Sequence, residues 1–156
     1  MRDARTMDVD HATAIARKAH RTARPLQDAL LLSHVERVAA SVPEWARPIA
    51  WLHEVLERSD MSEEELLREG LSSEELRAMR LLSRQESTSD AAYLGHIELI
   101  VRAGGTAGRL ARAIKRADLE DRRGHPLVRR NGWSPPYARA LHALERPESA
   151  RSRGAA

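Results

Sequence analysis

The sequence contains no cysteine and no phenylalanine, and aromatic residues make up only 3% of its 156 positions. Without cysteine the chain has no disulfides, no thiolate zinc sites and no cysteine nucleophile. The scarcity of aromatic residues leaves little stacking surface for single-stranded nucleic acid. No apolar run approaches the ~20 residues that span a bilayer, and the first six residues lack the apolar stretch of a secretory signal. We therefore expect a soluble, cytoplasmic protein without a membrane partner.

The apolar residues that are present favour helices. Alanine and leucine far outnumber valine, isoleucine and threonine, and they are the stronger helix formers. The length suits one domain. We expect a single all-α bundle of about six to eight helices over residues 8–146, with flexible termini at 1–7 and 147–156.

Caps and breakers divide this bundle into segments. Ser62 with Glu65 and Ser72 with Glu75 form two capping boxes, and proline and glycine end several periodic stretches. We expect polar or Gly- and Pro-rich loops at 87–90 and 124–135. The expected helices cover approximately residues 8–23, 26–41, 48–58, 62–70, 72–83, 90–104, 106–123 and 136–146.

The formal net charge is only +3, but the charge is unevenly distributed. Residues 54–75 are mainly acidic, whereas residues 102–130 carry nine lysines and arginines against three acids. Two helix faces of opposite sign exposed to solvent would give this pattern. So would a site that holds a metal ion on one side and phosphate groups on the other.

The stretch from Ile49 to Leu56 is apolar on nearly every side, which is typical of a buried helix, yet it contains His53 and Glu54. A buried carboxylate must be paired, hydrogen-bonded or bound to a metal, because burying it alone costs several kcal/mol. One turn later Glu57 shares a face with His53, and Arg58 shares one with Glu54. Pairing of Glu54 with Arg58 and of His53 with Glu57 would explain the helix without any catalytic role.

Two further residues extend the pattern. His34 lies among leucines and valines, where a histidine can also be an ordinary core residue. Asp118 lies at the edge of the apolar face of its helix. There it can also be a surface charge paired with Lys115 or Arg122. Taken together with His53 and Glu54, they offer two imidazoles and two carboxylates from three helices. That donor set suits Mn²⁺, Fe²⁺ or a similar divalent ion, which would activate water for attack on phosphorus.

The order of these residues resembles a known family. His34, then His53-Glu54, then Asp118 are similar to the ligands of the metal-dependent phosphohydrolases called HD domains after their His-Asp doublet. The resemblance is closest to the alarmone (ppGpp) hydrolases of the RelA/SpoT-like branch. It covers most of the chain, and the stretches that carry it are residues 16–21, 33–39, 50–57, 81–86 with Tyr93 and Ile97, and 113–121.

The resemblance implies an all-α domain that hydrolyses a phosphate or pyrophosphate bond in a small nucleotide, with a ppGpp-like guanosine polyphosphate as the first candidate. Mn²⁺ is the expected metal, with Fe²⁺, Zn²⁺ and Mg²⁺ as alternatives. It also implies that His34, His53, Glu54 and Asp118 are metal ligands and that Glu57 is the catalytic base that positions water. From their charge and position we further expect Arg58 to act as a catalytic cation and Lys115, Arg122 and Arg123 to bind phosphate.

The sequence departs from the family at several positions. Glu54 replaces the doublet aspartate, Arg58 replaces a second acid, Arg122 replaces an asparagine, Val35 replaces a proline, and residues 25–29 replace a Gly- and Tyr-containing segment.

The rival interpretation is therefore a degenerate HD domain that binds a nucleotide or a partner protein without hydrolysis. A nucleic-acid binder using the arginine-rich segment is a weaker interpretation, because the acidic segment opposes its field. The oligomeric state is left open.

Overall fold

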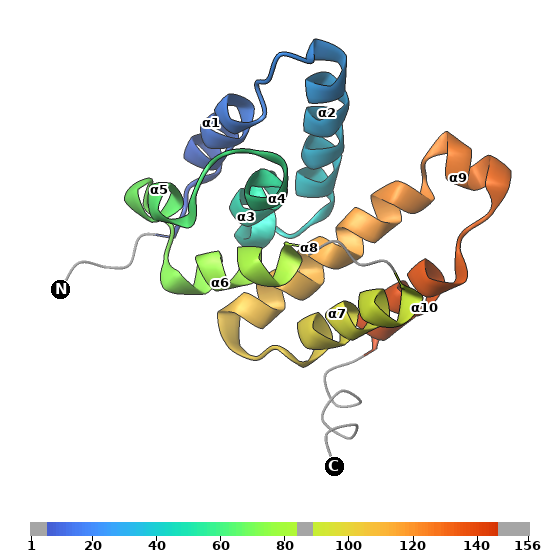
Figure 1. Ribbon diagram of the computed structural model, residues 1–156. Helices are drawn as coiled ribbons and strands as arrows, with labels where there is room; N and C mark the ends of the chain where they lie inside the picture. The colour runs from blue at the N-terminus through green and yellow to red at the C-terminus, as the bar shows by residue number, and fades with distance from the viewer. Residues whose placement is uncertain (1–5, 84–88, 147–156) are drawn as a thin grey trace.

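The computed structural model describes residues 6–83 and 89–146, and the elements within these ranges are all helical (Figure 1). This confirms the all-α class. The elements are α1 (Val9–Ala19), α2 (Pro25–Ser41), the 3₁₀ helix η1 (Glu44–Ala46), α3 (Arg47–Leu52), α4 (Val55–Arg58), α5 (Glu63–Arg68), α6 (Ser73–Leu82), α7 (Asp90–Arg102), α8 (Gly105–Arg123), α9 (Pro126–Asn131) and α10 (Pro135–Glu145).

Both predicted capping boxes form. The hydroxyl of Ser62 accepts from the Glu65 N–H, and the hydroxyl of Ser72 accepts from the Glu75 N–H, while each glutamate side chain reaches back to the serine N–H. The packed domain begins earlier than residue 8, because Met7 is buried and its N–H donates to Glu75 Oε1. The expected flexible tail at 147–156 lies outside the described residues, as do residues 1–5 and residues 84–88, which include the first half of the polar loop predicted at 87–90.

The structure corrects two of the predicted segments. The helix expected over 48–58 is interrupted at His53 and Glu54, which separate α3 from α4. The Ala50 carbonyl, which a continuous helix would offer to the Glu54 N–H, instead accepts from the backbone N–H and the ring Nδ1 of His53. The loop expected at 124–135 contains α9, whose start is capped by His125 and has Pro126 in its first turn.

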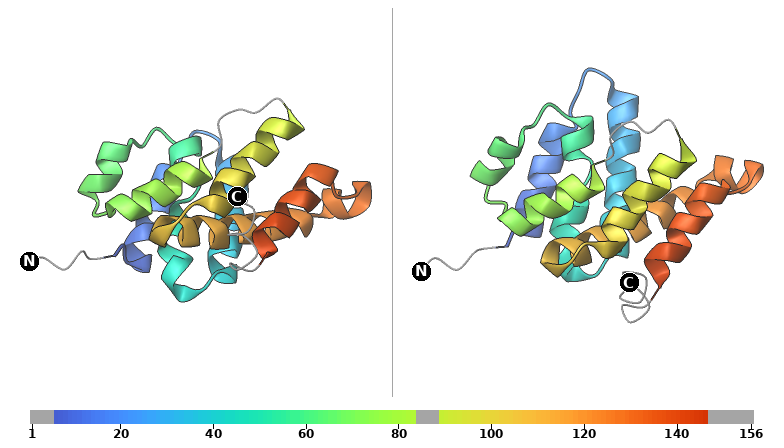
Figure 2. Two further views of the ribbon diagram at one scale, coloured as in Figure 1. Left: turned by 90° about the horizontal axis from the view of Figure 1, so that it is seen from below. Right: turned by 60° about the horizontal axis from the view of Figure 1, so that its bottom comes forward.

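Helix α8 is the element against which most of the bundle packs. It contacts α2, α3, α6, α7, α9 and α10, and its buried face includes Leu110, Ile114 and Leu119. Figures 1 and 2 show α8 crossing the molecule, with α1–α3 on one side and α7 and α10 on the other. No helix within the described ranges is long and apolar enough to span a bilayer. The position of α8 brings its polar residues next to α2 and the α3–α4 break.

Gly108 and Gly95 should respond in opposite ways to alanine. A Cβ at Gly108 in α8 would overlap the Ala103 carbonyl, whereas a Cβ at exposed Gly95 in α7 would meet nothing within 4 Å. Overpacking typically costs about 1–3 kcal/mol, while alanine gains about 1 kcal/mol over glycine in a helix interior. We expect Gly108→Ala to lower the free energy of unfolding and Gly95→Ala to raise it, measured by urea denaturation. Shifts of the same sign would contradict this packing at Ala103.

Candidate metal centre

Four of the predicted site residues meet at one point. His34 on α2, His53 and Glu54 at the α3–α4 break, and Asp118 on α8 each offer one ligand atom, and these atoms all lie within 4.8 Å of one another. His53, Glu54 and Asp118 are buried, and His34 is nearly so. This cluster can hold a metal ion, and we call it the metal centre.

Both imidazoles are held from outside the cluster through Nδ1. His53 Nδ1 lies 2.5 Å from the Ala50 carbonyl oxygen, and His34 Nδ1 lies 2.6 Å from Asp121 Oδ2. Each Nε2 therefore faces the carboxylates: His34 Nε2 lies 3.0 Å from Asp118 Oδ1, and His53 Nε2 lies 3.5 Å from Glu54 Oε1. A histidine that engages an outer partner through one nitrogen and presents the other inward has the arrangement of a metal ligand.

The electrostatic environment keeps both carboxylates ionised. Burial by itself raises the pKa of Asp118, but Lys115 and the hydrogen bond from His34 hold it well below its usual range. Burial also raises the pKa of Glu54, yet the neighbouring His53 and Arg122 bring it down to about 2. Burial lowers the pKa of His34, but Asp118 and Asp121 outweigh it and raise that pKa above 6.5. The centre thus presents two negative oxygens next to two imidazoles.

The ion pairs considered as alternatives to a metal site exist beside the cluster. Asp118 pairs with both Lys115 (Nζ to Oδ2, 3.0 Å) and Arg122 (Nε to Oδ1, 3.1 Å), and Glu54 Oε2 lies 3.6 Å from Arg58 Nε. The expected contact of His53 with Glu57 is not the one found, since His53 Nδ1 bonds to Ala50. Each carboxylate still has a second oxygen or lone pair directed toward the imidazoles, so these ion pairs do not preclude a metal.

The donor set fits a divalent transition ion. Two imidazole nitrogens and two carboxylate oxygens suit Mn²⁺, Fe²⁺ or Zn²⁺ better than Mg²⁺, which prefers oxygen ligands alone. His53 Nε2 and Glu54 Oε2 are buried and make no hydrogen bond among the described residues, although Glu54 Oε2 lies 3.6 Å from Arg58 Nε in an ion pair. Buried polar atoms without partners are uncommon and call for a ligand or an ordered water.

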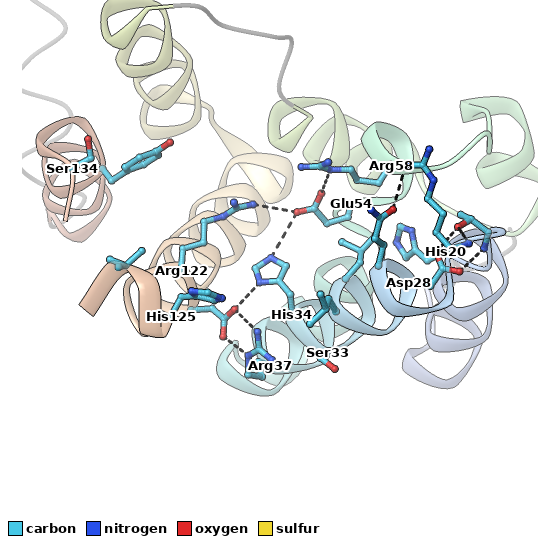
Figure 3. A pocket seen from close by; sticks show the side chains of 18 of the residues that line it. His20, Asp28, Ser33, His34, Arg37, Glu54, Arg58, Arg122, His125 and Ser134 are labelled. Atoms are coloured by element: carbon cyan, nitrogen blue, oxygen red, sulfur yellow. Dashed lines mark hydrogen bonds and ion pairs between the residues drawn. The ribbon is translucent and has the colours of Figure 1, made fainter. Parts of the chain in front are cut away.

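A pocket of about 1030 Å³ opens beside the metal centre (Figure 3). His34, Glu54, Arg58 and Arg122 line it at the metal centre, and dashed lines in Figure 3 join Glu54 to His34, Arg58 and Arg122. A smaller cavity of about 70 Å³ adjoins the centre and is lined by His53, Glu54, Asp118, Glu57, Lys115 and others. The metal centre therefore lies between a pocket large enough for a nucleotide and a cavity large enough for water.

The three cations predicted to bind phosphate differ in exposure and in the cavity that each of them lines. Arg122 lines the large pocket, and its side chain is 48% exposed. Lys115 is buried against Asp118 and lines the small cavity rather than the large pocket. Arg123 is exposed and is not among the residues that line either the large pocket or the small cavity. Neighbours on a helix diverge by 100°, which explains the difference between Arg122 and Arg123.

Sequence reasoning missed several residues around the metal centre. Asp121, one turn after Asp118, bonds to His34 and to Arg37, and Trp133 and Tyr137 form an aromatic wall of the large pocket. A signal for Asp121 existed: His34 and Arg37 on one helix, and Asp118 and Asp121 on another, repeat the same three-residue spacing. No signal identified the aromatic pair, because only the fold brings α9 and α10 over the pocket.

No family model matches the chain, and no curated protein matches it either.

Removal of one carboxylate should disable metal binding. Glu54→Gln and Asp118→Asn keep side-chain size but remove a charged ligand, so each should weaken Mn²⁺ binding by more than the about 10–100-fold typical of an outer-shell partner. Isothermal titration with Mn²⁺ alone measures this. Glu120→Gln is the matched control, because Glu120 lies on α8 and pairs only with Arg116 among the contacts in the structure. Wild-type affinity in either ligand variant would contradict the centre.

Arg122 and Arg123 should differ in nucleotide binding. Arg122→Ala removes a guanidinium from the pocket wall, and a charged hydrogen bond is worth about 1.5–3 kcal/mol, so binding of GDP in the presence of Mn²⁺ should weaken about tenfold or more. Arg123→Ala should bind GDP like the wild type. Fluorescence titration compares the two variants. Equal losses would mean that affinity follows net charge rather than the pocket wall.

Proposed function

We propose that this chain is a metal-dependent phosphohydrolase of the HD type that acts on a nucleotide phosphate or pyrophosphate. One observation carries the proposal: two histidines and two carboxylates from three helices place their ligand atoms within 4.8 Å beside a pocket of about 1030 Å³. The order of these residues in the sequence resembles that of the HD family, with Glu54 in place of the doublet aspartate. The proposal gives Mn²⁺ first place among the metals.

His34, His53, Glu54 and Asp118 would hold the divalent ion, which when bound would supply an activated water for attack on phosphorus. Glu57 supports the attack as a general base, since it is exposed and lines the small cavity together with His53, Glu54 and Asp118. Arg122 donates to phosphate oxygens from the pocket wall, and Arg58 lines both the pocket and the cavity. Lys115 holds Asp118 in place.

The pocket supports a nucleotide as the substrate. The guanidinium groups of Arg122 and Arg37 line it together with His125, and so do the aromatic rings of Trp133 and Tyr137, whose centroids lie 5.5 Å apart. Cations suit phosphate groups, and aromatic faces suit a base. The resemblance to alarmone hydrolases makes a ppGpp-like guanosine polyphosphate the first substrate to test.

A second candidate function is a degenerate HD domain that binds a nucleotide or a partner protein without hydrolysis. The observation that favours it is the ion pairing of the carboxylates: Arg58 and Arg122 lie 3.6 Å from Glu54, and Lys115 and Arg122 lie near 3 Å from Asp118. Three cations already offset two carboxylates. Arg58 in particular stands where the hydrolases have an acid.

Glu57→Gln separates the two candidates. The change preserves shape and removes the base, so phosphate or pyrophosphate release should fall about 10²–10⁴-fold while Mn²⁺ binding and thermal stability stay unchanged. The assay uses ppGpp, GTP and dNTPs with Mn²⁺. Glu64→Gln, an exposed glutamate of α5, is the matched control. Equal rates for wild type and Glu57→Gln would exclude Glu57 from the mechanism, and no turnover by the wild type would favour the degenerate domain.

A further inference from the structure

We propose that Asp121, itself held by Arg37, is a positioning residue for the metal ligand His34. It would fix the orientation and the tautomer of that imidazole, and so set the affinity of the centre for its metal. The inference rests on the metal centre of the proposed function but not on hydrolysis.

The contacts of Asp121 carry this inference. Its Oδ2 accepts from His34 Nδ1 at 2.6 Å, and both of its oxygens accept from the Arg37 guanidinium, at 2.7 Å from Nε and 3.1 Å from Nη2. The Asp121 side chain is 15% exposed and that of His34 14%, so little water competes for the bond. Asp121 is therefore fixed on both sides, by the ligand it orients and by a cation.

The spacing along α2 and α8 brings four residues into one group of hydrogen bonds and ion pairs. His34 and Arg37 are one turn apart on α2, and Asp118 and Asp121 are one turn apart on α8. Asp118 thus faces Nε2 of the His34 ring, and Asp121 binds Nδ1 of the same ring. Two carboxylates from a single helix hold opposite edges of one imidazole.

The second histidine of the centre is held differently. His53 Nδ1 bonds to the neutral carbonyl of Ala50, whereas His34 Nδ1 bonds to a carboxylate. A carboxylate on Nδ1–H places the free electron pair on Nε2 and makes that nitrogen a stronger donor to a metal, and loss of such a partner typically weakens metal binding about 10–100-fold. His34 is accordingly the histidine whose ligand strength depends on a side chain.

The alternative is that Asp121 only joins two helices through its ion pair with Arg37. In that case Asp121 and Arg37 contribute to stability alone, and removal of either has the same consequence. The two roles differ in one respect: Arg37 contacts Asp121 but has no contact with His34 among those found. Variants of Asp121 and Arg37 therefore distinguish a role in orienting His34 from a role in helix packing alone.

The test uses the full chain with Mn²⁺ alone as the probe. Asp121→Ala should weaken Mn²⁺ binding, measured by isothermal titration, about 10–100-fold. Asp121→Asn, whose amide oxygen still accepts from Nδ1–H, should recover most of the affinity. Arg37→Ala should stay near the wild-type affinity, and Glu120→Ala, which removes an exposed carboxylate of the same helix, should match the wild type.

Heteronuclear NMR of the histidine ring nitrogens adds a measurement that would not change if Asp121 only stabilised the packing of the two helices. In protein stripped of metal, at a pH where the ring is neutral, Asp118 competes for the proton at Nε2, so the share of His34 protonated on Nδ1 should be larger in the wild type and in Asp121→Asn than in Asp121→Ala. Melting temperatures, measured in parallel, identify any variant that fails to fold; if Asp121→Ala does not fold, Asp121→Leu, which also lacks an acceptor for Nδ1–H but fills more of the space, takes its place in both measurements.

Unchanged Mn²⁺ affinity in folded Asp121→Ala, or equal losses in Asp121→Ala and Arg37→Ala with an unchanged tautomer, would overturn the positioning role. These measurements need no turnover. Absence of nucleotide hydrolysis would count against the proposed function alone, and wild-type metal binding without Asp121 would count against this inference alone.

Discussion

The burial of two ionised carboxylates between three helices is the constraint on which the rest of the site depends. Glu54 and Asp118 are 4% and 3% exposed, and an isolated buried carboxylate costs several kcal/mol. The surrounding groups offset that cost: Lys115 and Arg122 reach Asp118, and His34 lies within 3.7 Å of both acids. Since these partners come from α2 and α8, the polar cluster also fixes how the two helices pack.

The break between α3 and α4 solves a geometric problem. Successive residues on a regular helix point 100° apart, so His53 and Glu54 would face different neighbours in a continuous helix. The His53 side chain takes the Ala50 carbonyl and replaces the next backbone hydrogen bond, and both residues then contribute to one cluster. The same contact holds the ring and ends the helix. One hydrogen bond, from His53 Nδ1 to the Ala50 carbonyl, therefore sets both the local backbone geometry and the orientation of the His53 ring.

Sequence reasoning predicted what depends on short spacing. Capping boxes at Ser62 and Ser72 gave correct helix starts, and polar residues on apolar faces identified all four members of the metal centre. It failed where the outcome depends on a partner far along the chain. The bond between His34 and Asp121 spans 87 residues, and the matching three-residue spacings on the two helices do not by themselves show that these helices meet. The helix break was missed for another reason, since a histidine side chain competing for a backbone carbonyl leaves the hydrophobic pattern unchanged.

The cations of α8 show that burial, more than charge, decides which residue can reach the large pocket. Lys115 and Arg122 both bind Asp118, yet their side chains are 10% and 48% exposed. A buried ammonium paired with a carboxylate cannot leave it without exposing an uncompensated charge, so Lys115 is committed to Asp118. Arg122 has several donors and lines the pocket, so it can contact Asp118 and still present N–H groups to the pocket. The arginine-rich run therefore contains one residue suited to the site, one that stabilises it, and others, such as Arg123, that are exposed on the helix surface.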